Sequence, residues 1–212
     1  MYIPSAFAEN RPEVLAKFIR ENSFGTLVTA HAEEGICASH LPFLLSEVDG
    51  RQTLVSHVAR PNAQWKSLRP DSDVLVIFQG PHAYISPRWY EAKLAVPTWN
   101  YTAVHVYGRP RLIEDPEEVR KVLSETVATY EGTGEGSWRV SNLPPDYVEK
   151  LRKAIMAFAI DVTRMEGKFK LNQNRSSVDR RGVIAALEAA PDQESQAVAA
   201  LMREELDEAS GG

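Results

Sequence analysis

Short apolar segments, either continuous or alternating with polar residues, fill most of the chain between residues 25 and 165, and their lengths are typical of strands. Val74–Phe78 is a continuous apolar run, short enough for a strand that is buried on both faces. Phe158, Ile160 and Val162 instead alternate with polar residues, as in a half-solvated strand. Strands rich in Val, Ile, Thr and aromatic residues are predicted over Gly25–His31, Ile36–Leu45, Thr53–Ala59, Val74–Gln79, His82–Ser86, Val96–Leu112 and Phe158–Met165.

Apolar residues at helical spacing occur before, between and after these strands. A helix over Arg11–Asn22 is predicted from its apolar face and from Asn10 as N-cap. A capping box with a proline at the first helical position starts another at Asp115–Glu118. A short helix over Asn62–Leu68 links two strands, and three more helices are marked by Val148, Leu151 and Ile155, by Val183, Ile184 and Leu187, and by Val198, Leu201, Met202 and Leu206.

Many short strands with few long helices favour one fold class, mainly β with flanking helices. A closed antiparallel barrel with peripheral helices fits this order better than a parallel sheet with crossovers. The pattern assigns residues 1–190 to one domain and residues 191–212 to an acidic C-terminal tail that is helical or disordered.

Composition and charge narrow the class of protein. The chain has 212 residues, 43% of them hydrophobic and 25% charged, which is ordinary for a soluble globular protein. No apolar run approaches the roughly 20 residues of a membrane helix. The first residues lack the features of a signal peptide, and Cys37 is the single cysteine. A cytoplasmic location is expected.

The net charge of -5 is unevenly spread. Residues 186–212 hold seven acids and one base, so the rest of the chain is close to neutral. The stretch Arg164–Arg181 holds six bases and two acids. The overall acidic balance argues against nonspecific nucleic-acid binding. The basic stretch has two interpretations: it binds an anion, or it is a solvated hairpin edge.

Polar and aromatic residues gather where the predicted strands end, at Ser39–Phe43, Ser56–Asn62, Phe78–Pro81, Pro97–Tyr101 and Lys170–Arg175. A phosphorylated aromatic cofactor needs this mixture, because cations and donors neutralise a phosphate while aromatic or apolar walls cover a ring. Residue patterns alone therefore predict a barrel-like protein with a polar pocket and leave its ligand open.

Other chemistry finds less support in the same residues. The five histidines show neither the spacing of a zinc protease nor cysteine partners, so no metal site is predicted. Ser39 and His40, like Ser56 and His57, are strand neighbours that point to opposite faces, so no catalytic nucleophile is predicted. The glycine-rich segment at residues 132–136 lacks a following Lys and Ser or Thr, and a flexible loop is expected there.

Several long motifs together resemble the PaiB family. The resemblance extends to about Leu187 and is absent from the acidic tail. The motifs are Met1–Pro4 (MYIP), Phe24–Thr29 (FGTLVT), Ser39–Phe43 (SHLPF), His57–Trp65 (HVARPNAQW), Val76–Pro87 (VIFQGPHAYISP), Val96–Tyr101 (VPTWNY), Val104–Gly108 (VHVYG) and Lys168–Arg175 (KFKLNQNR).

This resemblance implies an FMN-binding split β-barrel related to pyridoxamine phosphate oxidase, which forms a homodimer with FMN in the groove between subunits. Ser39 and His40 would lie beside the flavin. The segment from Ser56 and His57 to Trp65 would hold the phosphate, with Arg60 and the start of the following helix as anion partners. The cofactor-binding residues implied by position are Ser39, His40, Ser56, His57, Arg60, Asn62, Trp65, Thr98, Asn100, Lys170, Gln173, Asn174 and Arg175.

The resemblance also implies a function, that of an FMN-binding negative transcriptional regulator. A direct DNA contact would fall to the basic stretch, which has the highest density of positive charge. The alternatives are a flavin-dependent oxidoreductase acting on a small molecule, in which the cofactor carries the electrons, and a dimeric scaffold with an empty flavin site.

Overall fold

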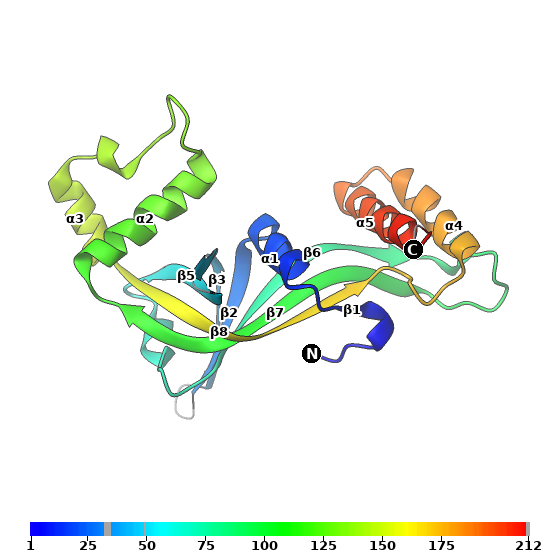
Figure 1. The fold of residues 1–212 in the computed structure, drawn as a ribbon, viewed down its shortest axis with the longest axis horizontal. Coiled ribbons are helices and arrows are strands. Elements are labelled where there is room, and N and C mark those ends of the chain that lie inside the picture. The colour runs from blue at the N-terminus through cyan, green and yellow to red at the C-terminus, as the bar shows by residue number, and fades with distance from the viewer. Residues whose placement is uncertain (32–34, 49, 211–212) are drawn as a thin grey trace. The chain divides into compact units, whose positions relative to one another are not determined.

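The computed structural model describes residues 1–31, 35–48 and 50–210, which form strands and helices in the order shown in Figure 1. The elements are η1 (Ser5–Phe7), β1 (Ala8–Glu9), α1 (Pro12–Glu21), β2 (Phe24–His31), β3 (Gly35–Pro42), β4 (Leu44–Val48), β5 (Arg51–Ala59), η2 (Ala63–Ser67), β6 (Val74–Ile85), η3 (Pro87–Trp89), β7 (Thr98–Ile113), α2 (Pro116–Glu131), η4 (Val140–Asn142), α3 (Pro145–Lys153), β8 (Ile155–Lys170), α4 (Ser177–Glu188) and α5 (Gln193–Ser210).

The strands form one eight-stranded sheet, and the predicted class, mainly β with flanking helices, is confirmed. Seven strands follow the order β3-β2-β6-β7-β8-β5-β4, and β1 pairs with β8. The pairs of β2 with β3 and β6, of β5 with β4 and β8, and of β1 with β8 are antiparallel. None of the described helices is long and apolar enough to span a membrane.

Several predicted strands differ from the observed ones. The predicted strand Phe158–Met165 is the middle of a longer strand, β8. Two other differences have an identifiable reason. The predicted strands Val74–Gln79 and His82–Ser86 are one strand, β6, which continues through Gly80. A Cβ at Gly80 would lie 2.5 Å from Thr102 Oγ1, so glycine permits this close packing. The predicted strand Ile36–Leu45 is instead interrupted at Phe43, between β3 and β4. Phe43 is buried, and its backbone N–H still bonds to Ser23 O, next to β2, at 2.8 Å. The following residue, Leu44, pairs with Val55 on β5, so the chain changes its partner strand at Phe43.

The chain divides into two compact units, which we describe separately. The first unit comprises Met1–Phe18, Gln79–His105 and Glu166–Gly212. The second unit comprises Ile19–Phe78 and Val106–Met165.

In the second unit, an aromatic core lies inside a curled part of the sheet. The ring of Phe43 packs edge-on against Phe78 and Phe158, with centroids 5.7 and 6.2 Å apart. Ser56 Oγ on β5 donates to Pro42 O on β3 at 2.6 Å. Strands β3 and β5, which are far apart in the strand order, therefore meet in this unit, as in a barrel.

Helix α2 covers a smaller apolar cluster of the second unit. Asp115 is its N-cap, and the carboxylate accepts a hydrogen bond from Glu118 N at 2.9 Å, which confirms the predicted start of this helix. The Glu118 carboxylate bonds to Arg111. In the apolar cluster, Val119 and Val122 of α2 pack with Ile113, Ala157 and Ala159 of the strands. Ile155, predicted as helical, is instead the first residue of β8, because α3 already ends at Lys153.

In the first unit, α4 and α5 lie side by side and bury a second core (Figure 1). Val198, Ala199 and Met202 on α5 have no exposed surface. The predicted acidic tail is thus a packed helix from residue 193 to residue 210. Its acids Glu194, Glu204, Asp207 and Glu208 are exposed, whereas Glu205 bonds to the buried Arg180 of α4; residues 211–212 lie outside the described residues.

Candidate functional site

The residues implied as cofactor ligands fall into two groups, one in each compact unit. The second unit holds Ser39, His40, Ser56, His57, Arg60, Asn62 and Trp65. The first unit holds Thr98, Asn100, Lys170, Gln173, Asn174 and Arg175.

In the second unit, Asn62 connects the turn after β5 to strand β3. Its Nδ2 donates to Ser39 Oγ at 2.9 Å, and its Oδ1 accepts from Gln64 N at 3.1 Å. Asn62 is the N-cap of η2, a helix of five residues. One N–H of this helix is therefore already bonded, and the expectation that its start offers free donors to a phosphate is wrong for Gln64.

Sequence reasoning missed Gln64, a buried residue that ties η2 to the β2–β3 hairpin. Its side chain is 3% exposed. Its Nε2 lies 3.3 Å from Leu27 O, 3.2 Å from Thr29 Oγ1 and 3.2 Å from Cys37 O. Its Oε1 is buried and has no partner among the described residues. The sequence signal was weak, since a glutamine in a short helix is usually on the surface.

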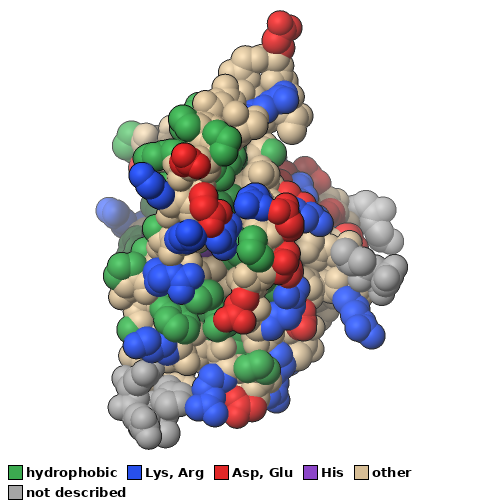
Figure 2. Space-filling model, turned by 90° about the vertical axis from the view of Figure 1, so that its left-hand side faces the viewer, with side chains coloured by type: hydrophobic (Ala, Val, Ile, Leu, Met, Phe, Trp, Pro, Cys, Tyr) green, Lys and Arg blue, Asp and Glu red, His purple; other side chains and the backbone are tan. Residues whose placement is uncertain are grey.

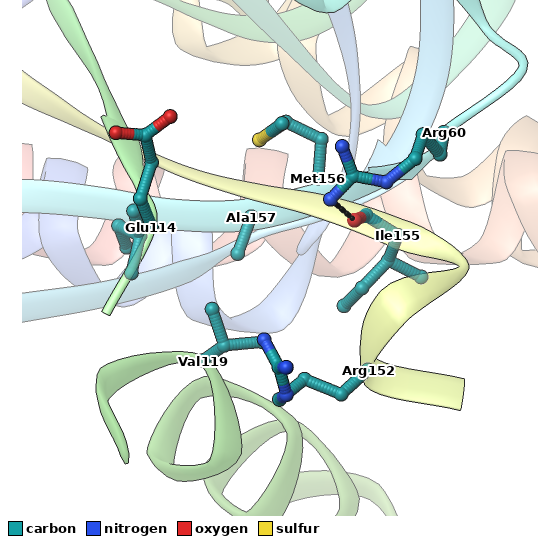
Figure 3. Close-up of a pocket in the computed structure, with 8 residues that line it drawn as sticks. Arg60, Glu114, Val119, Arg152, Ile155, Met156 and Ala157 are labelled. Atoms are coloured by element: carbon teal, nitrogen blue, oxygen red, sulfur yellow. Dashed lines mark hydrogen bonds between the residues drawn. The ribbon is translucent and has the colours of Figure 1, made fainter. Parts of the chain in front are cut away.

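Arg60 directly follows β5, and its guanidinium reaches back to the start of β8. Nε donates to Lys153 O at 2.8 Å and Nη2 donates to Ile155 O at 3.1 Å, the bond drawn in Figure 3. These bonds leave the Nη1 hydrogens without a partner among the described residues. The side chain lies at the edge of a cavity of about 220 Å³, with a largely apolar lining of Ile113, Val119, Ile155, Met156 and Ala157, and with Arg152 and Glu114 as further lining residues. Trp65 braces the same turn, because its Nε1 donates to Arg60 O at 3.1 Å.

The two Ser–His pairs do not form catalytic dyads among the described residues. The Ser56 hydroxyl is buried and donates to Pro42 O, so its proton is already used. His57 is half-buried, and burial lowers its pKa below the usual 6.5, so its imidazole is neutral at pH 7. His40 is exposed on β3, with its ring centroid 6.4 Å from that of Phe24.

In the first unit, Lys170 is the central cation. Its Nζ contacts Thr98 Oγ1 and Trp99 O. Burial and the nearby charge of Lys168 lower the pKa of Lys170. Both causes reflect the cost of keeping a positive charge here, and an anion close to Lys170 would relieve that cost.

The closing motif around Lys170 is a compact turn. Gln173 folds back on it, with Oε1 accepting from Leu171 N at 2.7 Å and Nε2 donating to Phe169 O at 2.6 Å. The guanidinium of Arg175 lies 4.8 Å from the centroid of the Tyr90 ring. Asn174 is exposed in the same turn. Gln173 therefore shapes the turn, whereas Asn174 and Arg175 present polar groups from it.

Asn100 lies beneath α5 instead of at an open surface. It is fully buried, its Nδ2 lies 3.3 Å from Met202 Sδ, and its Oδ1 has no partner among the described residues. The implied role of Asn100 at a flavin groove is not compatible with this arrangement unless α5 moves, because the helix covers the amide.

The donor set fits the phosphate of the implied cofactor. A phosphate carries a charge near -2 and needs cations or several donors around it. Arg60 has unused N–H groups, Lys170 bonds only to neutral oxygens, and Ser39 presents a hydroxyl. Each unit thus offers cationic and hydroxyl groups suited to an anion.

Comparisons with known proteins agree with this chemistry. The family described as "Putative FMN-binding domain" matches residues 1–164. "Protease synthase and sporulation protein PAI 2" of Bacillus subtilis is 38% identical over 206 residues, covering 97% of this chain and 98% of that protein. An uncharacterised protein of Emericella nidulans is 33% identical over 243 residues, covering 96% of this chain and 97% of its own length.

Two solved structures share the fold. The flavocytochrome Anf3 from Azotobacter vinelandii superposes with a TM-score of 0.59 at 16% identity, covering 77% of this chain and 69% of that chain. The FAD and heme binding protein from Mycobacterium smegmatis gives a TM-score of 0.60 at 15% identity, covering 84% of this chain and 79% of its own. These similarities confirm the split-barrel fold.

Proposed function

The chain belongs to the PaiB family of FMN-binding split-barrel proteins, and we propose that it acts as a negative regulator of transcription with FMN as its cofactor. The observation that carries this proposal is the 38% identity to PAI 2 of Bacillus subtilis over 97% of the chain, together with the family match over residues 1–164. The family match includes every motif of the candidate site except the closing motif Lys168–Arg175, which lies beyond residue 164. The similarity to PAI 2 extends over 97% of the chain and so over both compact units.

We propose that residues from each of the two groups bind FMN. In the second unit, Ser39 and Arg60 would hold the phosphate, and Asn62 would support Ser39 through its hydrogen bond to Oγ. His40 and His57 would lie nearby on β3 and β5. Ser56 and Trp65 would keep this turn in shape through their bonds to backbone oxygens. In the first unit, Thr98, Lys170, Asn174 and Arg175 would supply further polar contacts. FMN itself supplies a ring that accepts and donates electrons.

We also propose that the protein is a homodimer. In the first unit, Tyr84, Leu94, Val96 and Trp99 are large apolar residues with exposed side chains, and Leu94 is 93% exposed. The Trp99 ring lies 6.2 Å from that of Tyr84 and 5.8 Å from that of His82. Exposed apolar clusters of this kind are typical of protein interfaces, and a second copy of the chain is the occupant that the family implies.

The basic stretch Arg164–Arg181 gives limited support for direct contact with DNA. Arg180 is buried and bonds to Glu205, while Arg164 lies 3.7 Å from the centroid of the Tyr107 ring. Figure 2 shows basic and acidic side chains interspersed on the face drawn there. DNA binding generally requires clustered positive charge, so the proposed regulation rests on the family membership and not on a basic surface.

A deletion strain tests the regulatory function. Transcripts are measured in cells with the wild-type gene, without it, and with an Arg60→Ala variant that binds FMN weakly. We expect the same transcripts to rise in the last two strains. No rise in any transcript would contradict a negative regulator, and rapid flavin reduction by a nicotinamide in the purified protein would then favour an oxidoreductase.

A further inference from the structure

A chain of hydrogen bonds with a fixed direction runs through the second unit to Ser39. Gln64 N donates to Asn62 Oδ1 at 3.1 Å, and Asn62 Nδ2 donates to Ser39 Oγ at 2.9 Å. A backbone N–H is only a donor, so the atom of Asn62 facing Gln64 N must be the oxygen. The amide nitrogen of Asn62 therefore faces Ser39, and the direction of the chain does not depend on a choice of amide orientation.

The direction of this chain excludes Asn62 as the acceptor of the Ser39 proton. The hydroxyl oxygen accepts from Asn62, so its own hydrogen must be directed to another acceptor. The hydroxyl has no second partner among the described residues. Ser39 is half-buried on β3, which lies at one end of the strand order. The geometry thus leaves the Ser39 hydroxyl hydrogen as a donor that is available to a ligand.

Gln64 fixes this arrangement from the other side. Its Nε2 faces the carbonyls of Leu27 and Cys37 and the hydroxyl of Thr29, at 3.2–3.3 Å. Carbonyl oxygens only accept, so this end of the side chain must be the nitrogen. Because Leu27 and Thr29 lie on β2 and Cys37 on β3, Gln64 holds η2, and with it Asn62, at a fixed position beside the hairpin.

We propose that Asn62 and Gln64 are positioning residues that hold the Ser39 hydroxyl as a hydrogen-bond donor to the phosphate of bound FMN. This inference rests on the proposed function. An anionic oxygen is the strongest acceptor that FMN offers, and Arg60, two residues before Asn62, supplies positive charge to the same turn. The phosphate is therefore the part of FMN that this donor suits best.

The test is a double-mutant cycle with FMN and riboflavin titrated by flavin fluorescence. Asn62→Asp keeps an oxygen that caps Gln64 N but replaces the donor to Ser39 with an acceptor, so the Ser39 proton turns away from the ligand. Ser39→Ala removes the hydroxyl. The variants are Ser39→Ala, Asn62→Asp and the double variant.

Ser39→Ala should weaken FMN binding about tenfold and riboflavin binding by less than twofold. Asn62→Asp should weaken FMN more strongly, since it also adds a negative charge. On the Ser39→Ala background, Asn62→Asp should cause a smaller loss of FMN affinity. The difference should be about the fold-change that Ser39→Ala causes alone. Losses that simply multiply would show that Asn62 does not act through Ser39, and equal losses for FMN and riboflavin would exclude the phosphate as acceptor.

Gln64→Leu tests the positioning role of Gln64. The variant should lower the melting temperature, and it should also reduce the preference for FMN over riboflavin. A lower melting temperature with an unchanged preference would overturn the role of Gln64 at the phosphate. If the wild-type protein binds FMN but not more tightly than riboflavin, this inference fails and the cofactor stands; if it binds neither, both proposals fail.

Discussion

Individual residues of the site divide into those whose hydrogen bonds are used inside the chain and those that still present a donor. Ser56 and Gln173 belong to the first kind, because their polar atoms bond to backbone groups. Ser39, Arg60 and Lys170 belong to the second kind. Sequence motifs contain both kinds side by side, and only the fold separates them.

Replacing Arg60 should affect the phosphate of FMN and not its ring. A charge-assisted contact contributes roughly 1.5–3 kcal/mol, so Arg60→Ala should weaken FMN binding about tenfold or more, while riboflavin binding should barely change. Arg109→Ala is a control, because Arg109, like Arg60, is an exposed arginine of the same unit, and it pairs with Asp73 at 2.8 Å. Equal losses for FMN and riboflavin in Arg60→Ala would mean that Arg60 only supports the start of β8.

The half-buried imidazole of His57 should make stability depend on pH. Burial lowers the pKa of His57 in the folded state below 6.5, whereas in the unfolded chain it keeps its ordinary value. The unfolded state therefore binds a proton first as the pH falls below about 6.5, and stability is lost from there down through the folded pKa. Urea unfolding at pH 7.5 and pH 5 should show a smaller loss for His57→Gln than for the wild-type protein, and equal losses would contradict this.

At the scale of elements, α5 shows how a tail that looks dispensable becomes part of a core. Met202 is fully buried and contacts Asn100, whereas the neighbouring Arg203 is exposed and pairs with Glu188. Met202→Ala should destabilise the protein by about 2–5 kcal/mol, as large core truncations do. Arg203→Ala should leave the free energy of unfolding nearly unchanged. Denaturant unfolding of both variants checks this, and a stable Met202→Ala protein would mean that α5 does not pack as described.

Two adjacent arginines on α4 should behave differently. Arg180 is 5% exposed and bonds to Glu205 on α5, and burial lowers its pKa, whereas Arg181 is exposed and bonds to Ser177. Arg180→Ala should lower the melting temperature, because Glu205 loses its partner, and Arg181→Ala should not. Similar melting temperatures for both variants would contradict the burial of Arg180. Because Arg180 supports the packing of α4 on α5, replacing Arg180 and Arg181 together would not isolate a contact with DNA.

The sequence predicted the elements well where one local signal dominated. The capping box at Asp115 and the apolar spacing of α4 led to correct helices. It failed where contacts distant in sequence decide the outcome. The continuation of β6 depends on how Gly80 packs against Thr102, and the burial of Gln64 depends on acceptors from β2 and β3. The burial of Asn100 likewise depends on Met202 of α5, about a hundred residues later in the chain.

At the scale of the whole molecule, the dimer depends on the exposed aromatic cluster of the first unit. Sedimentation at micromolar concentration should give the mass of two chains, and Trp99→Ser should weaken the association. Trp138→Ser is a control, since Trp138 is a similarly exposed tryptophan of the second unit, at 43% against 53% for Trp99. A stable monomer for the wild-type protein, or equal effects of both variants, would contradict this interface.

The central claim is that this chain is an FMN-binding protein that recognises the phosphate, and one titration tests it most directly. Purified protein freed of flavin is titrated with FMN and with riboflavin, and the flavin fluorescence is followed. We expect saturable binding of FMN that is at least tenfold tighter than that of riboflavin, because the two ligands share the ring and differ in the phosphate. The account is contradicted if FMN does not bind.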